Sequence, residues 1–381
     1  MSARGAPALA LPGLAERLRD WRDAVQASAR FRRWAAGFPL TRPIARRRAR
    51  AVFDLAAGFV YSQVLAASVE LRLFALLAAG PLSADELAAR RDLPPEAAAR
   101  LLAAAAALRL VAPRDGGRFG LGPLGAALVD NKAVTEMVRH HAMLYADLAD
   151  PLALLRGDRG ETRLRRFWAY ARAGDPAALP EGAVADYSEL MAASQPMVAA
   201  EVLDAYDVGR HRCLLDIGGG EGAFLCAAAE RAPRLHGMLF DLPAVAARAG
   251  ARFAAAGLSG RMTAHGGDFT RDALPRGADL AALVRVVHDH DDAAALAILR
   301  AARAALPPHG VLLLAEPMAD APGAGRVGDA YFGFYLLAMG QGRPRTAARL
   351  AALLREAGFA RVRPARTRMP LIAGLLIADG H

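Results

Sequence analysis

The sequence has few cysteines and almost no lysine. Cys213 and Cys226 are the only cysteines in 381 residues, so the chain has no disulfide framework and we expect a reducing compartment. Lys132 is the only lysine, and arginine therefore carries nearly all of the positive charge. The hydrophobic fraction of 54% excludes a largely disordered chain.

The sequence also lacks a long apolar run and a secretory leader. The uncharged stretch from Leu55 to Val69 is shorter than the ~20 residues that cross a bilayer, and Tyr61 to Gln63 interrupt it. Near the N-terminus, Glu16 and Asp20 leave no apolar core for a signal peptide. We therefore expect a cytoplasmic protein with, at most, a peripheral membrane contact.

Length and charge set the remaining bounds. At about 100–200 residues per domain, the chain is long enough for two domains. The net charge of +10 allows nucleic acid, an anionic membrane or an acidic ligand as a partner and does not choose among them.

Residues 1–50 form a basic, aromatic N-terminal arm. Rings among arginines are typical of a segment that lies on an anionic membrane, and an arm packed on its own domain with a solvated arginine face remains the alternative. The residues are Trp21, Phe31, Trp34, Phe38, Arg30, Arg32, Arg33, Arg42, Arg46, Arg47, Arg48 and Arg50.

Residues 51–200 form a second, alanine-rich helical region. Ser83 and Glu86 form a capping box that starts a helix at 84–90, and a second helix is predicted at 95–108. Strands at 110–111 and 118–121, joined by a turn at 115–117, complete a winged helix. Its second helix has few side chains that could hydrogen-bond to base edges, which favours packing or dimerisation over DNA binding.

Residues 201–381 alternate strands and helices, which predicts an α/β fold with a parallel sheet covered on both faces. A helix from about Ala183 to Tyr206 leads into this domain, and we place the boundary near residue 200. The predicted strands are Cys213–Ile217, Leu235–Phe240, Leu280–Val287 and Val311–Ala315.

A glycine-rich turn, Gly218 to Gly222, follows the first of these strands. Glycines let the backbone turn tightly and approach a ligand, and the following helix N-terminus favours polar groups. A nicotinamide site would have a similar turn. Asp216 within the strand is unfavourable for a pyrophosphate but suits the cationic amino acid end of S-adenosylmethionine.

Two further acids follow successive strands. Asp241 is placed to hold two ribose hydroxyls, and Asp268 is placed to accept a hydrogen bond from an adenine amino group. Each acid alone could be a helix cap or a turn residue. Their occurrence at successive strand ends favours a nucleoside-containing cofactor.

His288 is the candidate general base, because imidazole titrates near physiological pH and lies here at the carboxyl edge of the sheet. Asp289 or Glu316 is placed to orient its ring. His288, Asp289 and His290 also suggest a metal site, but adjacent residues diverge and no spaced His/Cys ligand set accompanies them, so we expect no metal.

In their order along the chain, these motifs are similar to those of the S-adenosylmethionine-dependent O-methyltransferases of the plant caffeate/flavonoid type and their bacterial relatives. The resemblance starts at about residue 50. It rests on the glycine loop 216–222, Phe240-Asp241-Leu242-Pro243, Gly267-Asp268-Phe269, His288-Asp289, Glu316-Pro317 and Gly342-Arg343-Pro344-Arg345-Thr346. The arginine-rich leader and the run His288 to Asp292 resemble the carotenoid branch of photosynthetic bacteria.

This resemblance implies a Rossmann-like class I methyltransferase domain at 201–381 and an N-terminal winged-helix domain that forms a homodimer. It implies S-adenosylmethionine as cofactor and His288 as base, with Asp289 and Glu316 as supporting acids. The implied cofactor-binding residues are Asp216, Gly218, Gly220, Asp241, Leu242, Asp268, Phe269 and Arg285.

The implied substrate pocket is apolar. The family builds its pocket between the fifth strand and the Arg-Thr motif, where an aromatic and methionine stripe occurs here, although such a stripe is also typical of ordinary core. The candidate pocket residues are Met191, Tyr331, Phe334, Tyr335 and Met339. A pocket with few polar groups suits a long hydrocarbon.

The resemblance predicts methylation of the hydroxyl of an acyclic 1-hydroxy carotenoid of the demethylspheroidene/hydroxyneurosporene type. A phenolic or polyketide acceptor, and a regulator that senses the cofactor without catalysis, are the alternatives. The chain departs from the plant pattern twice. His290 replaces a tryptophan, and alanines at 347 and 348 follow Thr346 where the family has a second acid beside the catalytic histidine.

Overall fold

The computed structural model describes residues 13–158, 160–168, 181–323 and 325–380. The chain forms two compact units, residues 1–123 and 124–381. The first twelve residues of the predicted arm lie outside the described part of the chain.

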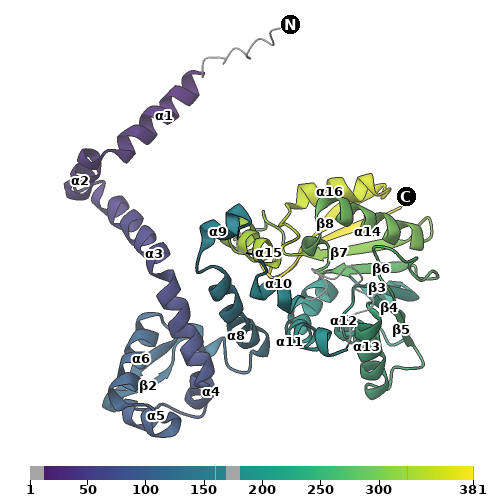
Figure 1. Ribbon diagram of the computed structural model, residues 1–381, viewed down its shortest axis with the longest axis horizontal. Coiled ribbons are helices and arrows are strands. Elements are labelled where there is room, and N and C mark those ends of the chain that lie inside the picture. The colour runs from purple at the N-terminus through teal and green to yellow at the C-terminus, as the bar shows by residue number, and fades with distance from the viewer. Residues whose placement is uncertain (1–12, 159, 169–180, 324, 381) are drawn as a thin grey trace. The chain divides into compact units, whose positions relative to one another are not determined.

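The first unit is mostly helical (Figure 1). Its elements are α1 (Leu14–Ala27), α2 (Ala29–Gly37), α3 (Arg42–Glu70), α4 (Leu73–Ala78), α5 (Ala84–Arg91), α6 (Pro95–Ala107), β1 (Val111–Arg114), the 3₁₀ turn η1 (Asp115–Gly117) and β2 (Arg118–Leu121).

The predicted winged helix is confirmed. The Ser83 hydroxyl accepts a hydrogen bond from the Glu86 N–H at 3.2 Å, and the Glu86 carboxylate accepts one from the Ser83 N–H at 2.7 Å. This capping box satisfies two N–H groups that the first turn of α5 leaves free. The strands β1 and β2 pair antiparallel, and Gly116 and Gly117 supply the positive φ angles of the turn between them.

The arm is highly exposed. Helix α1 buries none of its residues, and α2 buries only Ala35. The helix α3 is long and apolar enough to span a membrane by length and composition, with 11% of its most apolar window buried. Its exposed apolar side chains include Val52, Phe53, Leu55 and Phe59.

The second unit begins with helices and continues into the α/β domain. Its helices are α7 (Pro123–Ala126, which starts at the division), α8 (Lys132–Asp147), α9 (Pro151–Arg156), α10 (Arg163–Phe167), α11 (Glu181–Ala205), α12 (Ala223–Arg231), α13 (Pro243–Ala255), α14 (Asp292–Ala305), α15 (Gly333–Met339) and α16 (Ala347–Glu356). Short turns are η4 (Val208–Arg210), η5 (Val287–Asp289) and the π-helical η6 (Arg326–Phe332).

The sheet has seven strands in the order β5-β4-β3-β6-β7-β9-β8. The first five are parallel, and β9 and β8 add an antiparallel edge. The strands are β3 (Cys213–Ile217), β4 (His236–Asp241), β5 (Met262–Gly266), β6 (Leu280–Val284), β7 (Val311–Glu316), β8 (Arg361–Ala365) and β9 (Gly374–Asp379). The strand order reverses between β3 and β6, where open α/β sheets bind ligands.

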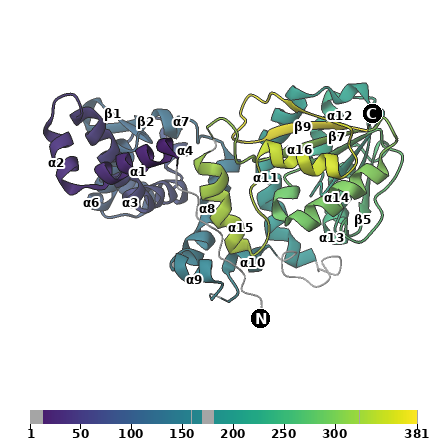
Figure 2. The same ribbon diagram turned by 90° about the horizontal axis from the view of Figure 1, so that it is seen from above.

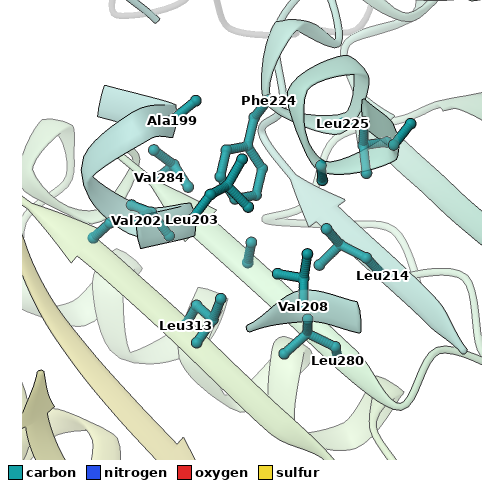
Figure 3. Packing of buried hydrophobic residues seen from close by; sticks show 14 of the residues in the cluster. Ala199, Val202, Leu203, Val208, Leu214, Phe224, Leu225, Leu280, Val284 and Leu313 are labelled. Carbon is teal, nitrogen blue, oxygen red and sulfur yellow. The ribbon is translucent and has the colours of Figure 1, made fainter. Parts of the chain in front are cut away.

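Alternating side chains of the strands form one core on each face of the sheet. Leu214 packs with α11, α12 and α13, whereas its neighbour Leu215 packs with α14 and α16. Figure 3 shows the first core, to which Val202 and Leu203 of α11 and Phe224 of α12 contribute side chains over the strands. Both faces are thus covered, which explains why the central strands are almost continuously apolar.

Helices α8, α10 and α15 pack against one another beside the sheet (Figure 2). Because α11 packs against both α8 and α12, the preceding helices join the second unit, and the division falls at residues 123–124 rather than near 200.

One predicted strand is longer than the observed one. The strand expected to reach Val287 ends at Val284, because Arg285 adopts a left-handed backbone with φ +58°. The next two N–H groups, those of Val286 and Val287, bind the Glu316 carboxylate instead of a neighbouring strand. His288 therefore lies in the turn η5.

Candidate active site

The glycine loop between β3 and α12 has a backbone that residues with a side chain rarely adopt. Gly218, Gly220 and Gly222 have φ angles of +67°, +58° and +78°, in the left-handed region that favours glycine. A Cβ on Gly219 would lie 2.4 Å from Asp216 Oδ2. The loop therefore presents bare backbone at the carboxyl edge of the sheet.

Asp216 lies buried beneath this loop. Burial, together with the nearby charge of Asp241, raises the pKa of Asp216 to about 8, so the carboxyl holds its proton at neutral pH. Its Oδ2 atom has no hydrogen-bond partner within the described part of the chain. A buried polar atom of this kind favours a polar ligand group close by.

Asp241 connects the loop to the end of β4. Its carboxylate accepts hydrogen bonds from the Gly220 N–H at 2.8 Å and from the Leu242 N–H at 2.7 Å. Burial raises the pKa of Asp241 to about 6, and these two bonds oppose the rise.

Asp268 and Phe269 follow β5. Asp268 Oδ1 accepts hydrogen bonds from the Thr270 N–H at 2.8 Å and from the Thr270 hydroxyl at 2.6 Å. The Phe269 ring meets His290 edge-on, with centroids 5.6 Å apart. The segment after β5, which carries Phe269, and the segment after β6, which carries His290, therefore lie side by side at the carboxyl edge of the sheet.

A cavity of about 360 Å³ lies over these strand ends, a size typical of small-molecule sites. Most of the predicted cofactor residues line it together: Gly218, Gly220, Asp241, Leu242, Asp268, Phe269 and Arg285, with Met191 and Asp289 beside them. Asp216 is not part of the lining and lies below the loop.

Several lining residues were not predicted from the sequence. Thr270 and Arg271 directly follow the Asp268-Phe269 motif, and their position next to it in the sequence could have predicted that they line the cavity. Trp168 and Gln195 come from segments far upstream, and only folding brings them to the cavity. Gln195 accepts a hydrogen bond from the Arg285 guanidinium at 3.2 Å.

His288 adjoins the cavity without lining it. Its Nδ1 atom lies 2.6 Å from Glu316 Oε2, and its Nε2 atom lies 3.1 Å from Asp289 Oδ1. Burial alone would lower the pKa of His288, but the charges of Asp289 and Glu316 outweigh it and raise the pKa above 6.5. Because Glu316 accepts at Nδ1, the neutral ring carries its proton there, and Nε2, which lies beside Asp289, is the nitrogen that can take a proton.

Asp289 lies beside the Nε2 atom of the His288 ring. Thr346 caps α16 by accepting a hydrogen bond from the Arg349 N–H at 3.1 Å, and the alanines after it offer no carboxylate. That Asp289 compensates for the missing acid stays a prediction, supported by its 3.1 Å distance from His288 Nε2.

Tyr331 and Tyr335, two of the other predicted substrate residues, lie in an aromatic layer of which Trp168 alone lines the cavity. The layer comprises Phe167, Trp168, Tyr331, Phe332 and Tyr335, with His140 and His141. Phe332 meets the His288 ring edge-on at 5.8 Å between centroids, so the layer adjoins the candidate base. Phe334 is half-buried, and Met339 is fully buried in the same cluster of helices.

Trp168 joins this layer to the cavity. It lines the cavity, and its indole N–H donates to the Tyr335 hydroxyl at 2.8 Å. The same hydroxyl bonds His140 Nε2 at 2.8 Å. Of the described residues, no group of three or more His, Cys, Asp or Glu is arranged to hold a metal ion.

Comparisons with known proteins agree with this geometry. An O-methyltransferase domain matches residues 145–360, and an O-methyltransferase dimerisation domain matches residues 53–131. The second match favours dimerisation over DNA binding for the winged helix.

Similar proteins match over nearly the whole chain. Demethylspheroidene O-methyltransferase of Cereibacter sphaeroides is 44% identical, over 92% of this chain and 92% of that protein. The Rhodobacter capsulatus protein of the same name is 42% identical, over 90% and 84%. The structure of human N-acetylserotonin methyltransferase in complex with S-adenosylmethionine matches with a TM-score of 0.70 and 25% identity, over 87% and 97%.

The glycine cradle, the acids at successive strand ends and the carboxylate-held histidine thus occur in a fold shared with these enzymes. The chain belongs to the O-methyltransferase family and is a homodimeric enzyme that uses S-adenosylmethionine as its methyl donor.

Proposed function

We propose that the protein methylates the hydroxyl group of an acyclic 1-hydroxy carotenoid, with His288 as the general base. The observation that carries this proposal is the 2.6 Å contact between His288 Nδ1 and Glu316, beside the cavity and the aromatic layer. The names of the two bacterial relatives support the substrate class.

The residues around the cavity fit S-adenosylmethionine. A Cβ on Gly219 would fill the loop, and the unpaired Oδ2 of Asp216 below it suits the cofactor's amino group. Asp241 would hold the ribose hydroxyls, and Asp268 with Phe269 would hold the adenine. The remaining contacts with the cofactor would come from Gly218, Gly220, Leu242 and Arg285. When bound, the cofactor supplies an electrophilic methyl group on a sulfonium.

His288 removes the substrate proton at Nε2. Glu316 holds the opposite nitrogen, so the ring is fixed in the tautomer that can accept a proton. A tertiary alcohol is much less acidic than a phenol, and deprotonation before attack is therefore disfavoured. We expect the proton to reach His288 during or after methyl transfer, with most of the rate enhancement arising from alignment.

The aromatic layer suits a hydrocarbon chain. Most of its polar atoms are bonded to one another: the Tyr335 hydroxyl to His140 Nε2 and the Trp168 indole, and the Tyr331 hydroxyl to His141 at 2.7 Å. His140 Nδ1 is buried without a hydrogen-bond partner in the described part of the chain. Burial lowers the pKa of His140 to about 4, so that imidazole is neutral at physiological pH. A wall whose hydroxyls and indole N–H are already paired offers mainly apolar surface to a substrate.

A substrate comparison tests this proposal. Purified protein is incubated with labelled S-adenosylmethionine and either 1-hydroxylated acyclic carotenoids in detergent micelles or simple phenols. We expect transfer to the carotenoids and loss of that transfer in His288→Ala. Transfer to phenols alone would establish the alternative, a phenolic or polyketide acceptor. Wild-type turnover in His288→Ala with intact cofactor binding would refute the base assignment.

We also propose that the enzyme works in the cytoplasm and rests its arm on an anionic membrane that holds the substrate. Trp21 and Trp34 are 67% and 53% exposed among arginines. Interfacial rings and basic side chains together favour such a surface. Anionic vesicles should sediment the protein in low salt, and Trp21→Ser/Trp34→Ser should weaken this whereas Leu155→Ser should not. Absence of recruitment in low salt would refute the contact.

A further inference from the structure

The side chain of Arg345 is buried beside the turn that carries His288. It lies in the loop between α15 and α16 and is 4% exposed. Its Nη1 donates to the Val287 carbonyl at 2.9 Å, and its Nη2 donates to the His290 carbonyl at 2.7 Å. Its Nε pairs with Asp292 at 2.9 Å. The guanidinium therefore binds the backbone on both sides of His288.

The backbone of the same loop binds the carbonyl between those two. The Arg343 N–H donates to the His288 carbonyl at 3.0 Å. Gly342 has φ +85°, and a Cβ there would lie 2.4 Å from the His288 carbonyl oxygen. The loop thus binds three backbone carbonyls in and next to the turn η5, those of residues 287, 288 and 290.

We propose that Arg345 is a positioning residue that fixes the direction of the His288 imidazole, an inference that rests on the proposed role of His288 as base. Glu316 holds the turn from its N–H side, through Val286 and Val287, and holds the ring at Nδ1. Arg345 holds the same turn from its carbonyl side. With both sides bound, the turn cannot rotate and the ring stays aligned with Glu316.

The chemistry of arginine suits this task. A guanidinium is always charged and carries five donors in a rigid fork, so it can bind two carbonyls and a carboxylate at once. A lysine in its place offers a single ammonium and cannot span the Val287 and His290 carbonyls in the same geometry. Asp292, the first residue of α14, balances the buried charge.

Arg349 provides a matched control. It pairs with the other carboxylate oxygen of Asp292 at 2.7 Å, yet its side chain is half-exposed and, within the described part of the chain, forms no hydrogen bond or ion pair with the turn. Arg349→Met therefore removes an arginine from the same acid without touching the carbonyls at 287 and 290. If Arg345 merely anchors α14, the two arginine variants should behave alike.

The experiment compares Arg345→Met, Arg345→Lys and Arg349→Met as full-length proteins. We expect kcat for the 1-hydroxylated carotenoid to fall by about 10- to 100-fold in Arg345→Met, since a small misplacement of a reacting group has this effect. The KM for S-adenosylmethionine should stay unchanged, Arg345→Lys should recover only part of kcat, and Arg349→Met should match wild type. Equal kcat in both methionine variants would overturn the proposal.

The pKa of His288 is a second readout, which needs no substrate. It tests the positioning role of Arg345 even if kcat falls for other reasons. The ¹³C-histidine resonance of His288, assigned with His288→Ala, reports its pKa. In Arg345→Met and Arg345→Lys the pKa should fall toward 6.5 as the ring loosens from its carboxylates. An unchanged pKa in folded variants would overturn the proposal.

The His288→Ala background separates this inference from the proposed function. If Arg345 acts through His288, adding Arg345→Met to His288→Ala should cause no further loss of kcat, whereas a full additional loss would overturn the inference. If His288→Ala alone keeps wild-type kcat, the base assignment itself fails.

Discussion

Replacing Glu316 with glutamine tests how strictly the structure sets the tautomer of His288. Glu316 is 1% exposed and accepts three hydrogen bonds. Its Oε1 binds the Val286 and Val287 N–H groups at 3.1 and 2.7 Å, and its Oε2 binds His288 Nδ1 at 2.6 Å. Glutamine keeps the shape but turns one acceptor oxygen into an NH₂ donor.

The geometry decides which way the new amide points. With its oxygen on the two backbone N–H groups, the amide keeps two bonds and presents NH₂ to His288 Nδ1. The opposite orientation sets NH₂ against two N–H donors and loses both bonds, at about 0.5–1.5 kcal/mol each. The first orientation is therefore favoured, and it forces the imidazole proton onto Nε2. An imidazole protonated at Nε2 cannot take the substrate proton, so kcat should fall by about 10²–10⁴.

Initial rates of transfer from labelled S-adenosylmethionine measure this loss. Glu316 does not line the cavity, so cofactor affinity by calorimetry should be unchanged. Asp279→Asn is a matched control, because Asp279 also accepts from two backbone N–H groups, those of Arg212 and Cys213, and from a histidine Nδ1, but at the opposite edge of the sheet. Wild-type kcat in Glu316→Gln would refute the tautomer argument.

Three other predictions concern pH, packing and stability. The carboxylates beside His288 raise its pKa more than burial lowers it, so kcat should rise with pH through a pKa above 6.5. Asp289→Asn removes one of these charges and should move the rise in kcat to lower pH. An unchanged pH–rate profile in this variant would contradict the argument. Gly219→Ala should weaken cofactor binding by about tenfold in calorimetry, because the added Cβ would lie 2.4 Å from Asp216 and overpacking a tight site costs about 1–3 kcal/mol. Unchanged cofactor affinity would contradict this prediction. The folded carboxyl of Asp216 holds its proton up to about pH 8, whereas the unfolded one releases it near 3.8, so this group's contribution to stability falls as pH rises between these values. Asp216→Asn should therefore raise the melting temperature of the cofactor-free protein at pH 7 and reduce the further rise that the cofactor causes, and a lower melting temperature would contradict it.

Local signals explain why much of the fold was predictable. The capping box at Ser83 and Glu86 starts α5 as expected, since both bonds form within one helical turn. The strand β3 has the predicted bounds because a short apolar run before a glycine turn has few alternatives. The grouping of Gly220, Asp241 and Asp268 at one cavity follows from chain order, since parallel strands end at the same edge.

The sequence alone therefore determined the α/β architecture, the glycine cradle and the position of His288 along the chain. Only the tertiary structure decided that β6 stops at Val284, where Arg285 turns left-handed and the Glu316 carboxylate replaces a neighbouring strand as the hydrogen-bond partner. It also decided that Arg345 binds the carbonyls around His288. The physical reason is that these contacts join residues far apart in the chain, and their geometry depends on how buried side chains pack rather than on any local propensity.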